Sequence, residues 1–474
     1  TLNELTLDAI LEGKVKARAA NLTWLAKQVD GVTIPLQLAK SLNLEAEIIA
    51  SATTVGMNDV SLRLGDMSFA GAIHSVLSPQ AEIDIVMNAN KIDLGPILDK
   101  HTAKTTAPTN SKPNNTTVPP KIPMPVTAIP RSFTLPKEIA ARFELGVQMA
   151  TYNDGIIRDT VVRGALQNGV LRIERFSATL PSSSDFKISG TLTLAEGMPQ
   201  FVGEIALNSN NLRGLTKWLG VNQAVLPQGR LRNFSYTSKL QANPKKAEIT
   251  AIAMQLDASQ FSGGMIAEFR PKPGIGLRLD VDKLNLDAYF PKSPKTPNHS
   301  PNGKPATLKN SSTGAPQIIN KPAILLRNAL NLVDANIELS ADQIILMGET
   351  AQNTMLNATI FENKITIHQA SIADFAGVGA SLSGSLDAVG ETPKFGVNFK
   401  TTIRNFEHLS GFTGIPSPLS SKSLGNVSGE GRIDATLAEA TMKVTAKAAG
   451  TRFKLDGTIE DYLTKPKFNL TTAV

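Results

Sequence analysis

The sequence of 474 residues has no cysteine, only 5% aromatic residues and no apolar run approaching the length of a membrane-spanning helix. Without cysteine there is no disulfide framework, no thiolate-bound zinc or iron–sulfur site and no thiol nucleophile. Without a long apolar run, no part of this sequence is expected to cross a bilayer as a helix. The hydrophobic fraction of 41% is nevertheless high enough for a folded chain.

Motifs of catalysis and cofactor binding are also missing. The sequence contains no HExxH, no GxxxxGK[ST] and no GxSxG pattern. Gly377 and Gly379 lack the third glycine of a dinucleotide-binding loop, and the five histidines show no metal-ligand spacing. Asp280 and Asp282 alternate with apolar residues, as solvent-facing carboxylates on a strand do. We therefore expect no enzyme activity, no catalytic residue, no cofactor and no metal site.

Two segments differ from the rest in composition. Residues 99–132 and 291–322 together hold 14 of the 28 prolines, with runs of Ser, Thr and Asn. This composition is typical of exposed, flexible, partly polyproline linkers. The segments carry net charges of +4 and +5, which leaves −2 of the total +7 on the remaining chain. Because a nucleic-acid-binding face needs clustered basic residues with stacking aromatic residues, we expect no nucleic-acid partner.

The sequence outside these segments repeats itself. An aromatic or apolar residue, followed closely by a glycine, opens an alternating strand at five places. The five glycines are Gly71, Gly190, Gly264, Gly384 and Gly457, and they lie 119, 74, 120 and 73 residues apart. A unit of 193 to 194 residues therefore occurs twice, and both chain ends fall inside a unit. We expect the chain to be part of a longer array of repeats.

Apolar and polar residues alternate in most of the repeated segments, which is typical of half-buried antiparallel strands. Only short helices are indicated, near residues 22–29, 212–219, 324–332 and 406–411. The predicted fold is therefore mainly β: a long, curled, repetitive antiparallel sheet, open as a groove, with a few short helices and two Pro-rich disordered insertions. The predicted β-groove repeats cover residues 1–98, 133–290 and 323–474, separated by linkers at 99–132 and 291–322. The first repeat is entered, and the last is cut, in the middle of a unit.

The alternating strands, the Phe-x-x-x-Gly strand openings and the segments at residues 211–220 and 280–291 resemble the AsmA family of bacterial envelope proteins. That family belongs to a broader class of repeating β-groove, bridge-like lipid transporters with TamB and the chorein-type proteins. The resemblance covers nearly all of the chain outside the two linkers, which depart from the family pattern. It implies a location in the periplasm of a Gram-negative bacterium and an inner-membrane anchor that precedes these residues. It also implies contact with phospholipid acyl chains and movement of phospholipid toward the outer membrane.

A long sheet with one apolar face must cover that face. A second layer would give a closed sandwich or solenoid, whereas bound acyl chains would give an open trough. A membrane barrel would need aromatic girdles, for which 2 Trp and 4 Tyr are too few. With the resemblance taken into account we favour the open trough, lined by apolar residues at alternating strand positions. The predicted lining residues are Phe143, Leu145, Val147, Ile205, Leu207, Leu277, Leu279, Val281, Phe395, Val397 and Phe399.

A second function is compatible with the same fold. The exposed edges of a long sheet can bind other proteins by strand addition. The chain would then be an assembly factor or scaffold that binds outer-membrane or periplasmic proteins.

Overall fold

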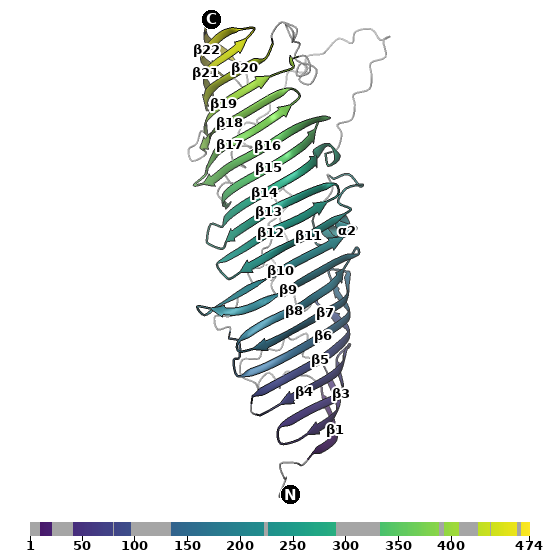
Figure 1. Cartoon of the computed structure of the whole chain (residues 1–474). Helices are drawn as coiled ribbons and strands as arrows, with labels where there is room; N and C mark the ends of the chain where they lie inside the picture. Colours follow the sequence, from purple (N-terminus) through teal and green to yellow (C-terminus); the bar gives the residue numbers. More distant parts are fainter. Residues whose placement is uncertain are drawn as a thin grey trace, which may run out of the picture. The chain divides into compact units, whose positions relative to one another are not determined.

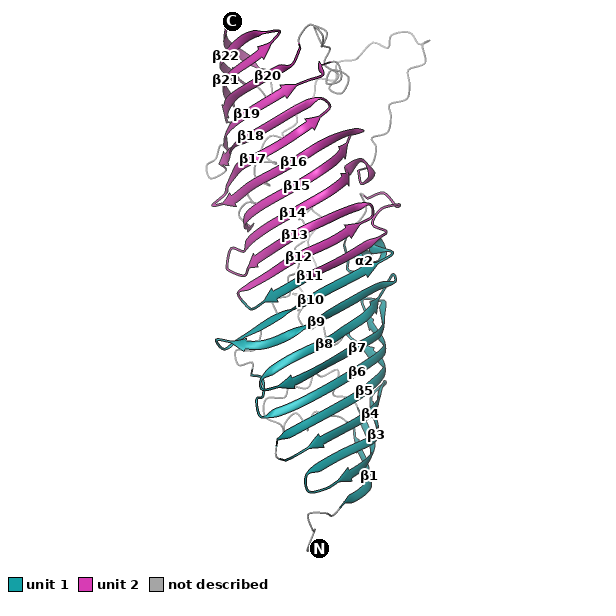
Figure 2. Cartoon of the chain, viewed as in Figure 1, with its two compact units in different colours: residues 1–222, 239–244 teal, residues 223–238, 245–474 magenta. Residues whose placement is uncertain are grey.

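Figure 1 shows the computed structural model of the chain. It describes residues 10–20, 41–78, 80–95, 134–221, 226–290, 332–387, 393–406, 425–436, 438–461 and 466–474. Both predicted linkers, residues 99–132 and 291–322, lie outside the described residues. The chain divides into two compact units, residues 1–222 with 239–244 and residues 223–238 with 245–474 (Figure 2). Strand β11 (Phe234–Ala242) contributes residues to both units.

Unit 1 contains ten strands that pair in the order of the sequence. They are β1 (Leu11–Ala19), β2 (Leu42–Ala50), β3 (Thr54–Leu64), β4 (Met67–Val76), β5 (Ala81–Asp93), β6 (Ile139–Tyr152), β7 (Gly155–Gln167), β8 (Val170–Leu180), β9 (Ser184–Ala195) and β10 (Met198–Ser209). All neighbouring pairs are antiparallel except β5 with β6, which run parallel. A short helix, α2 (Leu212–Trp218), follows β10.

Unit 2 repeats this arrangement with twelve strands. They are β12 (Lys246–Leu256), β13 (Ser259–Glu268), β14 (Gly274–Asn285), β15 (Asp334–Leu346), β16 (Glu349–Phe361), β17 (Lys364–Phe375), β18 (Val378–Asp387), β19 (Lys394–Ile403), β20 (Val427–Ala435), β21 (Glu439–Ala448), β22 (Thr451–Glu460) and β23 (Lys467–Ala473). Again all neighbouring pairs are antiparallel except one, β14 with β15. A turn of 3-10 helix, η3 (Leu286–Ala288), ends β14.

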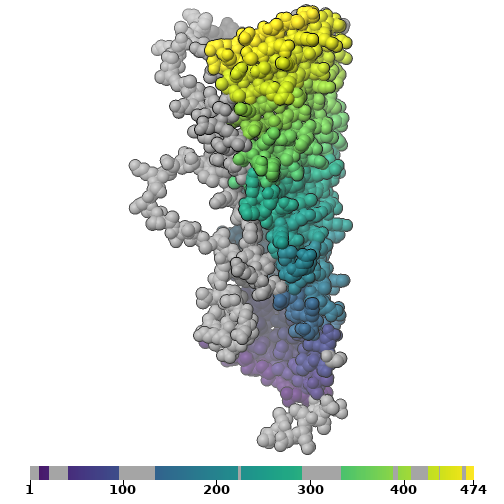
Figure 3. All heavy atoms as spheres, turned by 90° about the vertical axis from the view of Figure 1, so that its left-hand side faces the viewer, coloured from purple at the N-terminus to yellow at the C-terminus, as the bar shows by residue number. Residues whose placement is uncertain are grey.

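The predicted mainly β fold, an open and curled repetitive sheet with few helices, is confirmed within each unit. In the described part of the chain no pairing joins the first strand of a unit to its last. The colour bands of Figure 3 follow the sequence within each unit, because each strand lies beside strands that are close in the chain. The predicted helix near residues 212–219 is α2. The one near 22–29 lies outside the described residues, as do most of those near 324–332 and 406–411.

The repeat seen in the sequence is a unit of nine strands. Strands β3, β12 and β21 begin at residues 54, 246 and 439, so equivalent strands lie 192 and 193 residues apart. The step from β12 to β21 crosses nine strand pairs, of which eight are antiparallel and one is parallel. Because the number of reversals is even, equivalent strands run in the same direction. A parallel pair needs a crossover of a dozen or more residues, and this explains why a long connection precedes β6 and β15.

The curl of each sheet is produced by glycines. A Cβ atom at Gly384 would lie closer than 3.0 Å to the backbone of β19, because that strand bends toward the side on which the side chain would stand. The same approach of a neighbouring carbonyl oxygen occurs at Gly71, Gly164, Gly190, Gly203, Gly263, Gly384, Gly431 and Gly457. At five of these glycines the register partner adjoins a β-bulge. The five pairs are Val60–Gly71, Ile173–Gly164, Ile173–Gly190, Ile252–Gly263 and Ile367–Gly384. Glycines and bulges are the devices that bend a sheet sharply.

The core of the described part is small. Its buried apolar residues are alanines, with Val60 and Leu215 the only larger ones. A closed sandwich of this size would bury many large aliphatic and aromatic side chains between its layers. Within the described residues the sheets are therefore single layers, and their large apolar side chains stay partly exposed.

Candidate functional site

The strand register shows which side chains share a face, because directly paired residues on neighbouring strands point to the same side of a sheet. In unit 1 an unbroken row of paired residues crosses from β3 to β10. The row is Val60, Gly71, Met87, Leu145, Val162, Phe176, Ile188 and Ile205. All of its members are apolar, and we call this side the apolar face of unit 1.

Unit 2 has an apolar face of the same kind. A row of paired residues crosses from β13 to β22 without a polar member. The row is Gly263, Leu279, Leu339, Leu356, Ala370, Leu382, Phe399, Gly431, Val444 and Leu455. The eight curl-forming glycines belong to the apolar faces, so each sheet bends toward its apolar side. The apolar face is therefore the hollow side of each unit.

All eleven predicted lining residues stand on the apolar face of their unit. Leu145 and Ile205 belong to the row of unit 1, and Leu279 and Phe399 to that of unit 2. The other seven stand two or four positions along the same strands and therefore face the same way. Ten of the eleven are partly buried, and the remaining one, Leu145, is 38% exposed. Whether they contact lipid stays a prediction.

Most residues of the two apolar faces were not predicted from the sequence. Strand β8 shows why: Ile173 and Phe176 share the apolar face although three positions separate them, because a bulge lies between. Strand β17 has the same interruption between Ile367 and Ala370. A bulge shifts the alternation by one residue, and a search for a strict period of two then finds only half of the strand.

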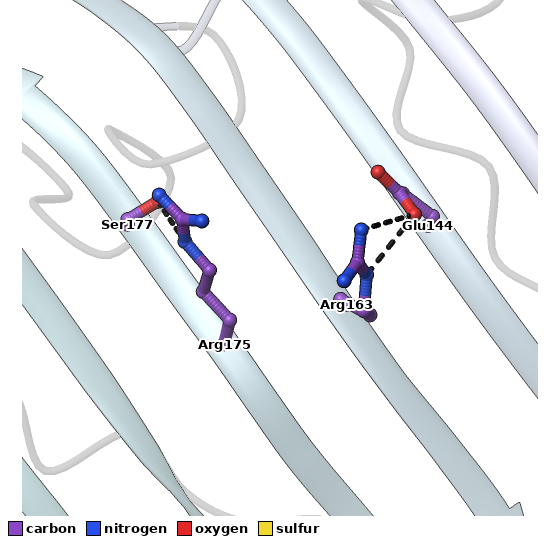
Figure 4. Close-up of polar contacts among 4 residues, drawn as sticks. All are labelled: Glu144, Arg163, Arg175 and Ser177. Atoms are coloured by element: carbon purple, nitrogen blue, oxygen red, sulfur yellow. Dashed lines mark hydrogen bonds and ion pairs between the residues drawn. The ribbon is translucent and has the colours of Figure 1, made fainter.

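The opposite side of each sheet, which we call the polar face, carries ion pairs across neighbouring strands. In unit 1 the Arg163 guanidinium donates to a carboxylate oxygen of Glu144 at 2.7 Å and 3.0 Å (Figure 4). On the next strand the Arg175 Nε donates to the Ser177 hydroxyl at 3.0 Å and turns away from Glu144. Exposed pairs of this kind contribute little stability.

Two polar clusters hold strand ends of unit 2. Asp257 accepts hydrogen bonds from three backbone N–H groups and, at 2.8 Å, from the Tyr289 hydroxyl. Burial raises the pKa of Tyr289 to about 12, and its bond to Asp257 adds to the rise. At the start of β15, Asp334 pairs with Lys272 at 2.6 Å and with Arg270 at 3.0 Å. The Lys272 hydrogen bond is the main reason why the pKa of Asp334 lies below its usual value.

Metal-ligating side chains do not cluster in the described part of the chain. No group of three or more His, Asp or Glu residues there is arranged to hold a metal ion. Asp280 and Asp282 lie on the polar face, where Asp280 bonds to Ser340 and Asp282 accepts from the Gln260 N–H at 2.7 Å. No helix among the described residues combines the length and the hydrophobicity needed to cross a membrane. No family model, no curated protein and no solved structure matches the chain.

Proposed function

We propose that the protein is a non-enzymatic conduit that binds the acyl chains of phospholipid, or of another acyl lipid, along its apolar faces. The observation that carries the proposal is the unbroken apolar row in each unit, which stays partly exposed on the hollow side of a single-layered sheet. A face of this size that the described chain itself does not cover marks a binding surface for apolar partners.

The energetics of such a surface suit transfer rather than catalysis. Moving a sixteen-carbon acyl chain into water costs about 12 kcal/mol at about 0.8 kcal/mol per CH2 group. An apolar trough lowers that barrier without any chemical step, since it needs only uninterrupted apolar positions. The lipid headgroup can stay in water at the open side.

The cellular setting of the proposal rests on the resemblance to the AsmA family. On that basis the conduit lies in the periplasm of a Gram-negative bacterium, anchored to the inner membrane, and carries phospholipid toward the outer membrane. Outer-membrane or periplasmic proteins are its proposed partners at the far end. Disturbed outer-membrane lipid composition after deletion of the protein would support this setting, and unchanged composition would contradict it.

The proposal is tested by placing a charge on the apolar face. Val397 lies in β19 on the apolar face, next to Asn398 on the polar face. We expect Val397→Asp to reduce transfer of a fluorescent phospholipid between vesicles at least about tenfold, because a carboxylate in the path of hydrocarbon is strongly disfavoured. Asn398→Asp is the matched control and should leave transfer unchanged.

Two outcomes would reject the conduit. One is undiminished transfer by a folded Val397→Asp variant. The other is a purified protein that carries no lipid detectable by native mass spectrometry. A lipid-free protein that captures envelope proteins through its strands would instead favour the scaffold.

A further inference from the structure

A depression of about 640 Å³ lies on unit 2 and is lined by residues of the six strands β17 to β22. Its charged and hydrogen-bonding side chains belong to the polar face, on the opposite side of the sheet from the row that contains Leu382, Phe399 and Val444. The volume is within the range of ligand sites, about 300 to 1,000 Å³. Leu382, Phe399, Gly431 and Val444 of the apolar row also line the depression, but its polar side chains stand on the polar face.

The two halves of the depression differ in chemistry. Over β17, β18 and β19 it is lined by hydroxyl, amide and imidazole groups, which can donate and accept hydrogen bonds. These are His368, Gln369, Ser381, Ser383 and Asn398. Over β19 to β22 it is lined by four cations and two carboxylates. These are Lys400, Arg432, Lys443 and Lys454, with Glu430 and Asp456.

The cations are only partly neutralised. Lys400 lies 3.6 Å from Glu430, and the Arg432 Nε donates to Asp434 at 2.6 Å. Lys443 and Lys454 form no ion pair with any residue that the structure describes, although Asp456 stands directly opposite Lys443. Close by, Lys447 of β21 stands directly opposite Arg452 of β22. Like charges opposite each other on neighbouring strands destabilise a sheet, and an anion bound beside these strands would reduce that repulsion.

From these two halves we infer that the depression binds an anionic, hydroxyl-rich ligand of the chemical class of a sugar phosphate. Lys443 and Lys454 contact the phosphate, because lysine ammonium groups bind phosphate as point charges. The hydroxyl and amide groups of β17 to β19 contact the sugar, whose hydroxyls both donate and accept hydrogen bonds. The headgroup of a phosphorylated glycolipid and a free sugar phosphate share this chemistry.

Calorimetric titration of the whole chain with glucose 1-phosphate tests the inference. We expect binding that is tighter than that of inorganic phosphate and of glucose, because only the sugar phosphate engages both halves. The double variant Lys443→Glu with Lys454→Glu should weaken binding at least about tenfold. The conservative pair Lys443→Arg with Lys454→Arg should keep it. Lys187→Glu, on the polar face of unit 1, is the control for charge reversal and should change nothing.

The outcomes that would overturn the inference are distinct. Absence of glucose 1-phosphate binding, or equal binding by the glutamate variant, would remove the site. Equal affinity for inorganic phosphate and for glucose 1-phosphate would show that the sugar does not contribute to binding. Vesicles that contain a phosphorylated glycolipid separate the two sources: recruitment of the wild-type chain but not of the glutamate variant identifies the headgroup, and binding of the soluble compound alone identifies the free sugar phosphate.

Discussion

Gly384 illustrates how a single position shapes the molecule. Its missing side chain leaves room for the backbone of β19, with the Cα of Val397 at 2.8 Å from the place of a Cβ atom. Val397 lies directly opposite on the apolar face. Four of the five glycines in the repeated signature therefore mark places where a sheet bends, and at the remaining one the bend is at Gly263 and not at Gly264.

Gly384→Ala should therefore be destabilising. The added methyl group meets backbone atoms that cannot move without shifting a strand, and such overpacking costs about 1–3 kcal/mol. Gly276→Ala is the matched control, since its nearest neighbour, a carbon of Ile266, is 3.9 Å away. Urea unfolding of the two variants checks the difference. Equal midpoints would show that the sheet tolerates a side chain at the bend.

Asp334 provides a pH-dependent contribution to stability. Its pKa is lowered in the folded chain, so its ion pairs with Lys272 and Arg270 stabilise the fold above the unfolded pKa, about 3.9. That stabilisation is lost as the pH falls through the lower, folded pKa. We expect Asp334→Asn to lose about 1 kcal/mol at pH 7, a small value because both partners are partly exposed. The gap between variant and wild type should close in urea titrations at pH 3, and a gap independent of pH would contradict this role.

At the scale of elements, helix α2 is held at one end of the strands of unit 1. The Trp218 Nε1 donates to the Tyr152 carbonyl at 2.9 Å, and the two rings meet edge to face with centroids 6.3 Å apart. On the same helix Leu215 is only 2% exposed. These contacts fasten the helix to the β6–β7 hairpin.

Trp218→Ala should release the helix locally. Loss of the hydrogen bond and of the ring contact leaves Leu215 as the main anchor, so amide hydrogen exchange should accelerate in α2 and at the tip of the β6–β7 hairpin. Exchange in β3 and β4 should stay as in the wild type. Lys217→Ala, at an exposed position of the same helix, serves as the control. Unchanged exchange in the tryptophan variant would mean that Leu215 alone holds the helix.

The elements also show what the sequence can and cannot predict. Strands such as β6 and β19 alternate without interruption over Phe143 to Val147 and over Phe395 to Phe399, so their apolar faces were predicted correctly. The corresponding residues of β8 and β17 were not predicted, because a bulge in each strand shifts the alternation by one residue. The parallel pairs β5–β6 and β14–β15 were not predicted, because the alternation of apolar and polar residues does not depend on the direction in which a strand runs. The cluster of Asp257 with Tyr289 joins residues that only the folded chain brings together.

At the scale of the whole molecule, two apolar faces raise the question of whether both units serve one path. If lipid passes both units in turn, one obstruction is enough to stop it. We expect Val147→Asp in unit 1 and Val397→Asp in unit 2 each to reduce vesicle-to-vesicle transfer as far as the double variant does. Gln148→Asp, on the neighbouring polar-face position of β6, is the control for unit 1. Additive losses would show instead that each unit carries lipid independently.

The single parallel pair in each nine-strand repeat has an evolutionary consequence. If all nine strand pairs of a repeat were antiparallel, the tenth strand would run opposite to the first. A duplicated stretch of sequence would then enter the sheet in the reverse direction, with its turns and bends at the wrong places. The single parallel pair restores the original strand direction. A tandem copy of the repeat can therefore continue the same sheet without rearrangement. A long protein of this architecture can therefore lengthen by simple duplication, and the prolonged connection that makes the exceptional step possible is the feature that permits such growth.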